Sequence, residues 1–586
     1  MNQKILLDLI KKQNQVVFYQ KPKFLFEGQP GGKYIGTSYF YNLLKENSKE
    51  IEKKFDREVF FICPKTLVIQ TDLFKDFMDQ NNLWDFSYYT NNDKQIKERF
   101  LKAEFNREQK KQFYRLMNFF DKPIVVRSSS IQEDAERASF AGIFYSIFLP
   151  KPNQIQISDI ENAIKLIYAS QYLKKAKEFY DRLNILAGDE RMAIMIQEVA
   201  GMEHTTQQRL LYYPELSFVC FSFNEYATKM INPSDGFYRL SLGLGLGAVE
   251  MESQMSVSVN IGRPNPIIGL NSIKDIIKNS PKYFYALELS KKDLTIFNEN
   301  EFVLKLPIEE IDPAILSRHA TLYDEDFNPV FLKIQDSRRY SLYVDFKKSI
   351  NYTKNGINSV IKFLMEMLRE NFEKDVDFEG AIDIIEQKNQ TIYIFYPLQA
   401  RFQVRDERSR KEKLPEIEEN KILLKGHGAG GKGEYLINYV VLVNQEIKGF
   451  YRYNNEIGLE ISQINLELKE IGSKARYLLL TPGRFGTIDP SVGISADFSY
   501  ISHAEAIVEV ISSRNIPTGG THFFEDVRSA GMAYLHTEQN GELVQKKFFS
   551  LATKIQKRKY CFVLEYEKPL KLEIDKESNY ILYFQG

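Results

Sequence analysis

The sequence predicts an α+β protein of at least two domains, because strand-like and helical patterns are mixed along its whole length. Short β-rich runs, among them Pro123–Val126, Ala193–Ile196 and Thr391–Tyr396, alternate with helical patterns at Ser158–Tyr180 and Ile357–Asn371. A chain of 586 residues also exceeds what one hydrophobic core usually organises. We therefore expect a larger first domain and a smaller second one.

The clearest domain boundary is the segment 405–420, RDERSRKEKLPEIEEN, where charges are dense and apolar residues are sparse. We expect a first domain over residues 1–404, a charged linker over 405–420 and a C-terminal α+β domain over 421–586. In the second domain, strand-like Tyr435–Asn444 and Tyr477–Leu480 lie on either side of a helical pattern at Ile461–Ile471.

Composition excludes several classes of function. Lys plus Arg equals Asp plus Glu at 78 each, so no net charge attracts the protein to nucleic acid or to an anionic membrane, although a local basic patch stays possible. No apolar run is long enough to span a bilayer, and the N-terminus lacks the apolar stretch of a signal peptide. The three cysteines, Cys63, Cys220 and Cys561, are far apart and form no CxxC pair, which favours a reducing compartment and predicts a cytoplasmic protein.

Two segments near the N-terminus carry residues suited to binding phosphate. Gly31-Gly32-Lys33 precedes a helical stretch, where glycines let amides approach an anion and the lysine adds a charge. The segment Val125–Ser130 places Arg127 near a strand end beside three serines, and Ser139–Gly142 follows with small residues. Read separately, the first is an ordinary loop with an exposed lysine and the second is a strand that ends in a serine turn.

Two later segments complete the set. Gly243, Gly245 and Gly247 alternate after the strand-like Tyr238–Leu242, which suits a backbone lying against a ligand or, equally, against another strand. Alternation puts Asp377 and Glu379 on one strand face, where two carboxylates can hold magnesium between phosphate oxygens. Gln399 adds a neutral oxygen and Arg401 a charged clamp. Without the other segments, a solvated acidic strand edge would be the simpler interpretation.

Taken in order, these motifs resemble the nucleotide-binding domain of pyruvate phosphate dikinase and phosphoenolpyruvate synthase. The resemblance includes Val-Ile-Gln-Thr-Asp-Leu-Phe at 68–74 and covers about residues 25–402. It implies an ATP-grasp fold, with ATP and Mg²⁺ as ligands. Two departures are Phe402, where the family usually has proline, and a longer segment between Glu379 and Gln399.

The resemblance also implies roles for single residues. Lys33 and Arg127 would contact ATP phosphates, and Arg401 would act with them in catalysis. Gln197, Gly243 and Gly245 would lie near the nucleotide. Asp377, Glu379 and Gln399 would surround the metal. Glu379, Gln399 and Arg401 would also belong to the nucleotide site.

The second domain has fewer readable motifs. Gly426–Gly433 nearly spells a Walker loop, but Gly433 stands where a magnesium-binding hydroxyl is needed, so we do not expect a second ATPase. Gly483–Gly486 and Gly520–Phe524 resemble the C-terminal part of bacterial pyruvate/phosphoenolpyruvate-binding proteins. No segment of barrel size remains unassigned, so we do not expect the chain alone to phosphorylate pyruvate.

Histidines provide the remaining candidates. Dikinases relay phosphate through a histidine in a Thr-Ser/Cys-His-Ala-Ala setting, and Ser502-His503-Ala504 is locally similar. His503 and His522 are therefore candidate phosphate carriers, with a structural or binding role as the alternative. The sequence predicts a magnesium-dependent phosphotransferase that passes phosphate from ATP to a histidine or to a bound acceptor, small molecule or protein. A nucleotide-binding regulatory module is the alternative, nucleic-acid binding is disfavoured, and the oligomeric state is left open.

Overall fold

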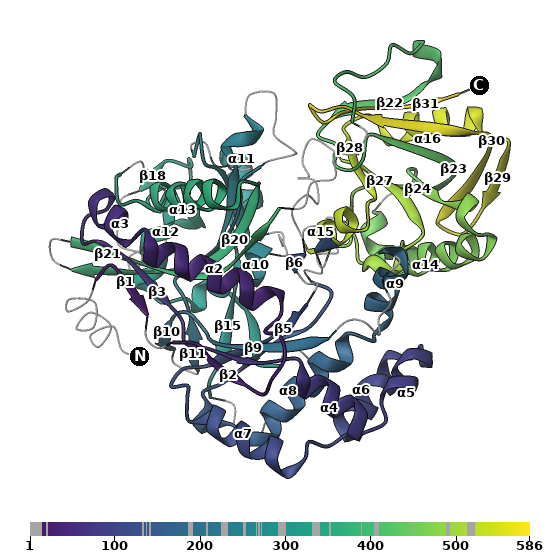
Figure 1. Cartoon of the computed structure of the whole chain (residues 1–586). Helices are drawn as coiled ribbons and strands as arrows, with labels where there is room; N and C mark the ends of the chain where they lie inside the picture. The colour runs from purple at the N-terminus through teal and green to yellow at the C-terminus, as the bar shows by residue number, and fades with distance from the viewer. Residues whose placement is uncertain are drawn as a thin grey trace.

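The structure is a computed structural model in which two domains lie side by side, the N-terminal one being the larger (Figure 1). It describes residues 14–18, 21–131, 134–135, 138–139, 142–183, 185, 191–206, 209–223, 232–249, 254–264, 267, 270, 272–290, 301–330, 340–350, 353–387, 390–403, 410–447, 449–487, 493–511 and 522–585. Parts of three predicted segments lie outside these residues, namely the phosphate loop after Ser130, residues 405–409 of the charged linker and the glycines before His522.

The N-terminal domain is built around two sheets. The large sheet has the strand order β1-β3-β21-β20-β12-β13-β14, and the small sheet has the order β2-β4-β9-β5-β8. The strands of the large sheet are β1 (Val16–Phe18), β3 (Val59–Cys63), β21 (Gln390–Phe402), β20 (Val376–Gln387), β12 (Leu216–Phe221), β13 (Phe237–Leu242) and β14 (Ser256–Asn260). Those of the small sheet are β2 (Lys23–Leu25), β4 (Thr66–Ile69), β9 (Met192–Glu198), β5 (Ile124–Ser130) and β8 (Ser146–Leu149).

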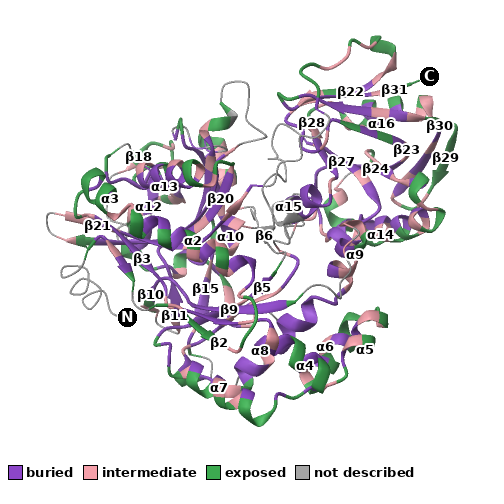
Figure 2. Cartoon of the chain, in the orientation of Figure 1, coloured by how far each residue is buried: buried purple, intermediate pink, exposed green. Residues whose placement is uncertain are grey.

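Strands β3, β4 and β9 consist entirely of buried residues, as expected for apolar runs that are covered on both faces. Helices cover these sheets with their apolar sides turned inward, and exposed residues lie on their outer sides (Figure 2). They are α2 (Gly32–Glu46), α3 (Ser48–Lys54), α4 (Asp72–Gln80), α5 (Trp84–Tyr89), α6 (Asp93–Lys102), α7 (Arg107–Met117), α8 (Ile157–Ser170), α9 (Lys174–Leu183), α10 (Leu246–Val249), α11 (Ile273–Asn279), α12 (Pro313–His319) and α13 (Ile357–Phe372).

The single helical pattern at 158–180 forms two helices, α8 and α9. The Ser170 hydroxyl donates to the Ile167 carbonyl and accepts from the Tyr145 amide, so it competes with the helical bonds at this point. The amide of Tyr172 then bonds three residues back, to Ala169, instead of four. The helical spacing of apolar residues continues across the break between α8 and α9, because both helices pack apolar residues into the same core.

Three smaller sheets extend the first domain. They are β10-β11-β15-β16, β18-β17-β19 and the hairpin β6-β7. Their strands are β10 (Met202–Thr205), β11 (Leu210–Tyr213), β15 (Tyr283–Glu288), β16 (Val303–Pro307), β17 (Ala320–Tyr323), β18 (Pro329–Val330), β19 (Ser341–Val344), β6 (Asp134–Ala135) and β7 (Ala138–Ser139).

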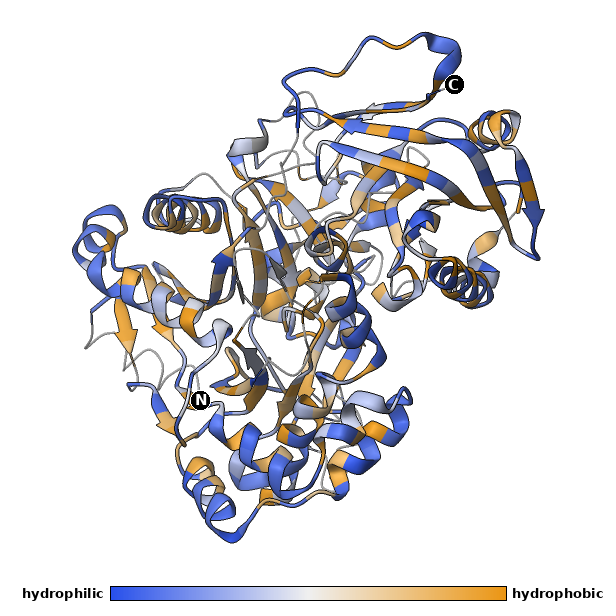
Figure 3. Ribbon diagram, turned by 45° about the vertical axis from the view of Figure 1, so that its right-hand side comes forward, coloured by the Kyte–Doolittle hydropathy of each residue, from blue (hydrophilic) through white to orange (hydrophobic). Residues whose placement is uncertain are grey.

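The C-terminal domain is a mixed sheet of order β22-β31-β30-β23-β24-β27-β28, with β29 paired to β30. Strands β23, β24, β27 and β28 run parallel. The strands are β22 (Ile422–His427), β23 (Glu434–Val443), β24 (Tyr477–Thr481), β27 (Ala504–Val510), β28 (Ala533–Thr537), β29 (Lys554–Lys557), β30 (Cys561–Ile574) and β31 (Asn579–Phe584), with a short pair β25 (Arg484–Phe485) and β26 (Gly493–Ile494). The helices are α14 (Asn454–Ile471), α15 (His522–Ser529) and α16 (Gly541–Leu551). Hydrophobic residues concentrate in the strands at the centre of each domain (Figure 3).

The described part of the charged segment, which starts at Arg410, contacts the C-terminal domain. Arg410 is buried, and its guanidinium donates to the Gly431 carbonyl and to the Ser578 hydroxyl. Lys411 forms an ion pair of 2.6 Å with Glu573. Arg410 and Lys411 are therefore held against the C-terminal domain.

Helix α9 docks the two domains together (Figure 1). The Glu178 carboxylate accepts hydrogen bonds at 2.7 Å from Lys469 and from Ser502 of the C-terminal domain. Lys175 forms an ion pair of 2.9 Å with the buried Asp526 of α15. Phe179 packs edge-on against Phe498. Charged and apolar contacts thus combine on one helix to join the domains.

None of the helices within the described ranges is long and apolar enough to cross a bilayer.

Candidate nucleotide site

A mostly apolar cavity of about 160 Å³ lies between the large and small sheets of the N-terminal domain. Strands β5, β8 and β9 form one wall, and β12, β20 and β21 form the other. Its lining residues are Val125, Arg127, Ser146, Phe148, Gln197, Glu198, Val199, Ala200, Pro214, Ser217, Leu244, Gly245, Leu246, Val249, Glu379, Ala381 and Leu398. A small apolar space with a few polar side chains is typical of a site for a planar ligand such as a nucleobase.

Lys33 lies in the first turn of α2, where it is buried, and its ammonium donates to the Ser128 hydroxyl at 3.0 Å. Gly31 caps the helix at a φ of 77°, and a Cβ on it would lie 1.7 Å from the Ser129 carbonyl oxygen. This glycine is therefore needed because the loop packs directly on β5. That packing brings Lys33 to the residue that follows Arg127.

Arg127 joins the two walls of the cavity. Its guanidinium donates to the Gln399 side-chain oxygen at 2.9 Å and lies 3.6 Å from the Glu379 carboxylate. Glu379 and Gln399 are direct cross-strand partners on β20 and β21. The hydroxyl of Thr37 on α2 donates to the Leu398 carbonyl, next to Gln399. Residues that are far apart in the sequence thus meet at one side of the cavity.

Asp377 and Arg401 form a cross-strand pair two residues further along the same hairpin. Nε and Nη2 of Arg401 both lie 3.0 Å from one oxygen of the Asp377 carboxylate, and both side chains are nearly buried. In the part of the chain that the structure describes, no three acidic, histidine or cysteine residues gather as ligands for a metal ion. The carboxylate of Glu379 and the amide oxygen of Gln399 are nevertheless hard oxygen donors on adjacent strands, which fit the ligand preference of Mg²⁺.

The glycine-rich run has two different roles. Gly243 ends β13 at a φ of 70°, and a Cβ there would lie 2.3 Å from the Tyr285 carbonyl oxygen, so a backbone contact requires this glycine. A Cβ on Gly245 would meet only Ser217, at 3.5 Å, and Gly245 lines the cavity. The strict alternation expected along a strand ends at Gly243, because residues 246–249 turn into α10.

Arg239 supports this turn and was not among the predicted residues. It is fully buried, its guanidinium lies 5.3 Å from the centre of the Phe221 ring, and it donates to the Ala248 carbonyl. A strand pattern contains no signal for such a residue, because the carbonyls that it binds come from a turn formed only in the folded chain.

Gln197, which the resemblance places near the nucleotide, lines the cavity, and its amide donates to the Tyr41 hydroxyl at 2.9 Å. The neighbouring Glu198 was missed. Burial raises the pKa of the Glu198 carboxyl, against the opposing effect of Lys122 and Lys65. Burial likewise lowers the pKa of the Lys122 ammonium. A buried acid that lines the cavity therefore lies within electrostatic range of a buried base.

His503 is not among the described residues that line the cavity. His503 immediately precedes β27, and a ring nitrogen lies 3.1 Å from the Gly472 carbonyl. Burial, followed by the nearby Arg476, lowers the pKa of this imidazole. His522 is the first residue of α15, and its side chain lies outside the described part of the structure.

The Walker-like segment has a packing role. A Cβ on Gly426 would lie 2.6 Å from the Tyr580 ring, and the Lys432 ammonium lies over the Tyr435 ring. These contacts account for a glycine and a lysine of the motif without a phosphate.

The fold is of the α+β class, and a cavity lies between its two main sheets. The family model of the pyruvate phosphate dikinase AMP/ATP-binding domain matches residues 29–421, about two thirds of the chain. The protein therefore belongs to this family, and the resemblance seen in its motifs is confirmed. Among curated proteins, a search returns no similar sequence.

Proposed function

We infer that the protein is a magnesium-dependent phosphotransferase that takes a phosphoryl group from ATP. The observation that carries this inference is the contact of Arg127 with both Glu379 and Gln399 beside the cavity. Charge neutralisation at a phosphoryl group requires a fixed cation next to a carboxylate that can hold a metal.

The base of ATP would occupy the cavity between the sheets, where Leu244 and Leu246 supply apolar contacts and Gln197 a polar one. Its phosphates would extend toward Arg127 in the middle of β5 and Lys33 in the first turn of α2. Arg401, two positions beyond Gln399 on β21, would clamp the terminal phosphates. Mg²⁺, when bound by Glu379 and Gln399 and with Asp377 nearby, would offset the phosphate charge.

In the proposed reaction, a nucleophilic atom of the acceptor forms a bond to phosphorus, and the phosphorus–oxygen bond to the departing nucleotide breaks. A neutral imidazole can serve as that acceptor. His503 and His522 are the candidates, and an acceptor bound by the C-terminal domain, either a small molecule or a protein, is the alternative. All three cysteines are buried free thiols, which supports a cytoplasmic setting for the reaction.

One contact favours a second candidate function. The Asp377 carboxylate is engaged by Arg401, so the acidic pair is not preset as two metal ligands. A nucleotide-binding regulatory module without transfer activity would have this arrangement.

The deciding experiment incubates purified protein with magnesium-ATP and separates ATP, ADP and AMP over time. We expect ATP consumption in the wild type and a loss of roughly a hundredfold in Arg127→Ala, because one fixed phosphate contact is removed. Arg115→Ala, an exposed arginine on α7, is the matched control. Binding of ATP without any consumption would establish the regulatory module instead.

The carrier is tested separately with ATP labelled at the β- or γ-phosphate. A phosphohistidine is acid-labile and base-stable, so label of this kind should appear on the protein and vanish in His503→Ala or in His522→Ala. ATP consumption without protein-bound label would show that transfer goes directly to another acceptor or to water.

A further inference from the structure

A second cavity, larger and more open than the first, lies at the junction of β10, β11 and α12. Its volume is about 600 Å³, and it is lined by His204, Thr205, Thr206, Tyr213, Glu309, Glu310, Ile311, Asp312 and Pro313. Among these described lining residues three are acidic, and neither lysine nor arginine is present. Arg209 lies 3.7 Å from Glu310 and offsets one of the three charges.

His204 turns a hydrogen-bond acceptor into this space. Its side chain is 10% exposed and stacks on the Tyr213 ring, and Nε2 lies 3.2 Å from the Tyr213 carbonyl. A carbonyl only accepts, so Nε2 carries the proton and Nδ1 presents a lone pair. Burial lowers the pKa of His204, which favours this neutral ring.

The Nδ1 atom of His204 lies 4.0 Å from the Asp312 carboxylate. Two acceptors face each other across the edge of a cavity whose remaining charges are negative. Both are satisfied by a ligand that carries a positive charge and several N–H donors. We propose that this cavity is a binding site for a small organic molecule with a primary ammonium group, and that its occupation is coupled to the nucleotide cavity.

The coupling follows from the residues that separate the two cavities. Tyr213 lines the ammonium cavity, and the next residue, Pro214, lines the nucleotide cavity. The Tyr213 hydroxyl accepts from the Asp312 amide at 3.3 Å. Further along, the Ser217 hydroxyl donates to the Gly243 carbonyl and lines the nucleotide cavity.

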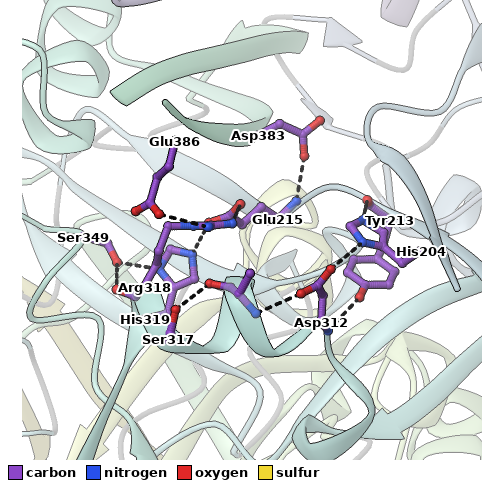
Figure 4. Close-up of polar contacts among 11 residues, drawn as sticks. His204, Tyr213, Glu215, Asp312, Ser317, Arg318, His319, Ser349, Asp383 and Glu386 are labelled. Carbon is purple, nitrogen blue, oxygen red and sulfur yellow. Dashed lines mark hydrogen bonds and ion pairs between the residues drawn. The ribbon is translucent and has the colours of Figure 1, made fainter. Parts of the chain in front are cut away.

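Helix α12 adds a second connection, which Figure 4 shows. Its cap, Asp312, borders the ammonium cavity, and its last two residues, Arg318 and His319, hold Glu215. Arg318 binds the Glu215 carboxylate with two hydrogen bonds of 2.6 Å. The backbone carbonyl of Glu215 accepts from the Gly243 amide at the start of the glycine-rich run. A shift of α12 is therefore transmitted to the floor of the nucleotide cavity.

Binding is tested by calorimetry on the full chain, with 1,4-diaminobutane and methylammonium as probes. We expect 1,4-diaminobutane to bind the wild type and to bind about tenfold more weakly to Asp312→Asn and to Glu309→Gln. Asparagine and aspartate are about equally good N-cap residues, so Asp312→Asn should keep α12 intact. Glu98→Gln, an exposed acidic residue on α6, should leave the affinity unchanged.

Tetramethylammonium has the same charge but no N–H group, so it should bind more weakly than methylammonium. The proposed site is overturned if neither primary ammonium probe binds, if tetramethylammonium binds equally well, or if both cavity variants bind like the wild type.

Coupling is measured as the ATP affinity with and without 1,4-diaminobutane. This measurement requires only that the protein binds ATP. Its result therefore does not depend on whether the protein transfers a phosphoryl group. We expect a change of about fivefold, and by linkage ATP must change the diamine affinity by the same factor. The change should be several-fold smaller in Asp312→Asn at a diamine concentration near the wild-type Kd, where a tenfold weaker variant is only about one-tenth occupied. Diamine binding that leaves the ATP affinity unchanged would overturn the coupling.

Discussion

Asp377 and Glu379 stand two residues apart on β20, yet their carboxylates have different partners. Asp377 is nearly buried and held by Arg401, whereas the Glu379 side chain is 22% exposed and lies beside Arg127 at the cavity. Glu379 is therefore the better placed of the two to reach a metal and its phosphate ligands. Within the proposed acidic pair, Glu379 is suited to contact the metal and its phosphate ligands, whereas Asp377 fixes the orientation of the Arg401 guanidinium.

Glu379→Gln keeps the shape of the side chain and removes its charge. We expect the variant to fold normally and to lose magnesium-dependent ATP turnover by about a hundredfold, as is usual when a charge-stabilising group is removed. ATP consumption measured over a magnesium titration checks this, with Glu98→Gln as the control for an exposed glutamate. Full turnover in Glu379→Gln would remove Glu379 from the proposed metal site.

Asp383 is a fully buried carboxyl whose titration should affect stability. It accepts from the Glu215 amide and from the Tyr396 hydroxyl, and burial raises its pKa to about 6 (Figure 4). Because the folded pKa lies above the unfolded value, the folded chain binds the extra proton, and this stabilisation is lost as pH rises through about 6. Asp383→Asn cannot titrate and should not lose it.

We expect the free energy of unfolding of the wild type to fall relative to Asp383→Asn between pH 4.5 and 7.5, by about 2 kcal/mol. Urea unfolding of both proteins across this range measures the difference, in which the other titrating groups cancel. Parallel curves would show that Asp383 has an ordinary pKa in the folded protein.

At the scale of elements, the turn from β13 into α10 determines the shape of the nucleotide cavity. Three features hold it in place, namely the backbone contact at Gly243, the hydroxyl of Ser217 and the buried guanidinium of Arg239. Gly243 contacts backbone and Gly245 lines the cavity, so alanine substitutions at these two positions can separate an effect on folding stability from an effect on ATP binding.

Gly243→Ala should destabilise the protein by about 2 kcal/mol or more, because the methyl group meets a backbone oxygen at a positive φ. Gly245→Ala should change stability by less than about 1 kcal/mol and reduce ATP affinity, since its methyl group enters the cavity. Thermal unfolding and ATP calorimetry of both variants test this pair. Equal stability losses would show that the two glycines share one structural role.

At the scale of the whole molecule, α9 joins the domains through ion pairs that combine buried and partly exposed partners. Asp526 is fully buried in α15, and its partner Lys175 belongs to the other domain and also donates to the Gly142 carbonyl. Gly142 ends the loop that follows Arg127 and the serines. The same lysine therefore contacts the predicted phosphate loop and the C-terminal domain.

Lys175→Ala should lower the free energy of unfolding by roughly 2–4 kcal/mol, because it leaves a buried carboxylate without this partner. The double variant Lys175→Ala with Asp526→Ala should lose less than the sum of the two single losses. Lys94→Ala breaks an exposed pair with Glu98 and should change stability by less than about 0.5 kcal/mol. Urea unfolding of the wild type and these four variants decides this, and strictly additive losses would argue against a direct coupling across the domains.

The sequence by itself determined the family and the α+β class. The phosphate-binding motifs of this family contain glycines, cations and carboxylates in a set order along the chain. This order can be recognised in the amino-acid sequence without the structure. The bounds of α13, β23 and β24 also lie within a few residues of their patterns, since local periodicity sets them. Lys33, Arg127, Glu379 and Gln399 were identified as candidates for the same reason, although their catalytic roles remain predictions.

Only the tertiary structure decided which of these groups contact one another. The pairing of Asp377 with Arg401, the support of the turn by Arg239 and the grip of α12 on Glu215 depend on burial and on strand register. It also decided that Arg410 and Lys411 are held against the C-terminal domain. Contacts between residues hundreds of positions apart leave no local pattern, because their energies arise only when folding excludes water from both partners.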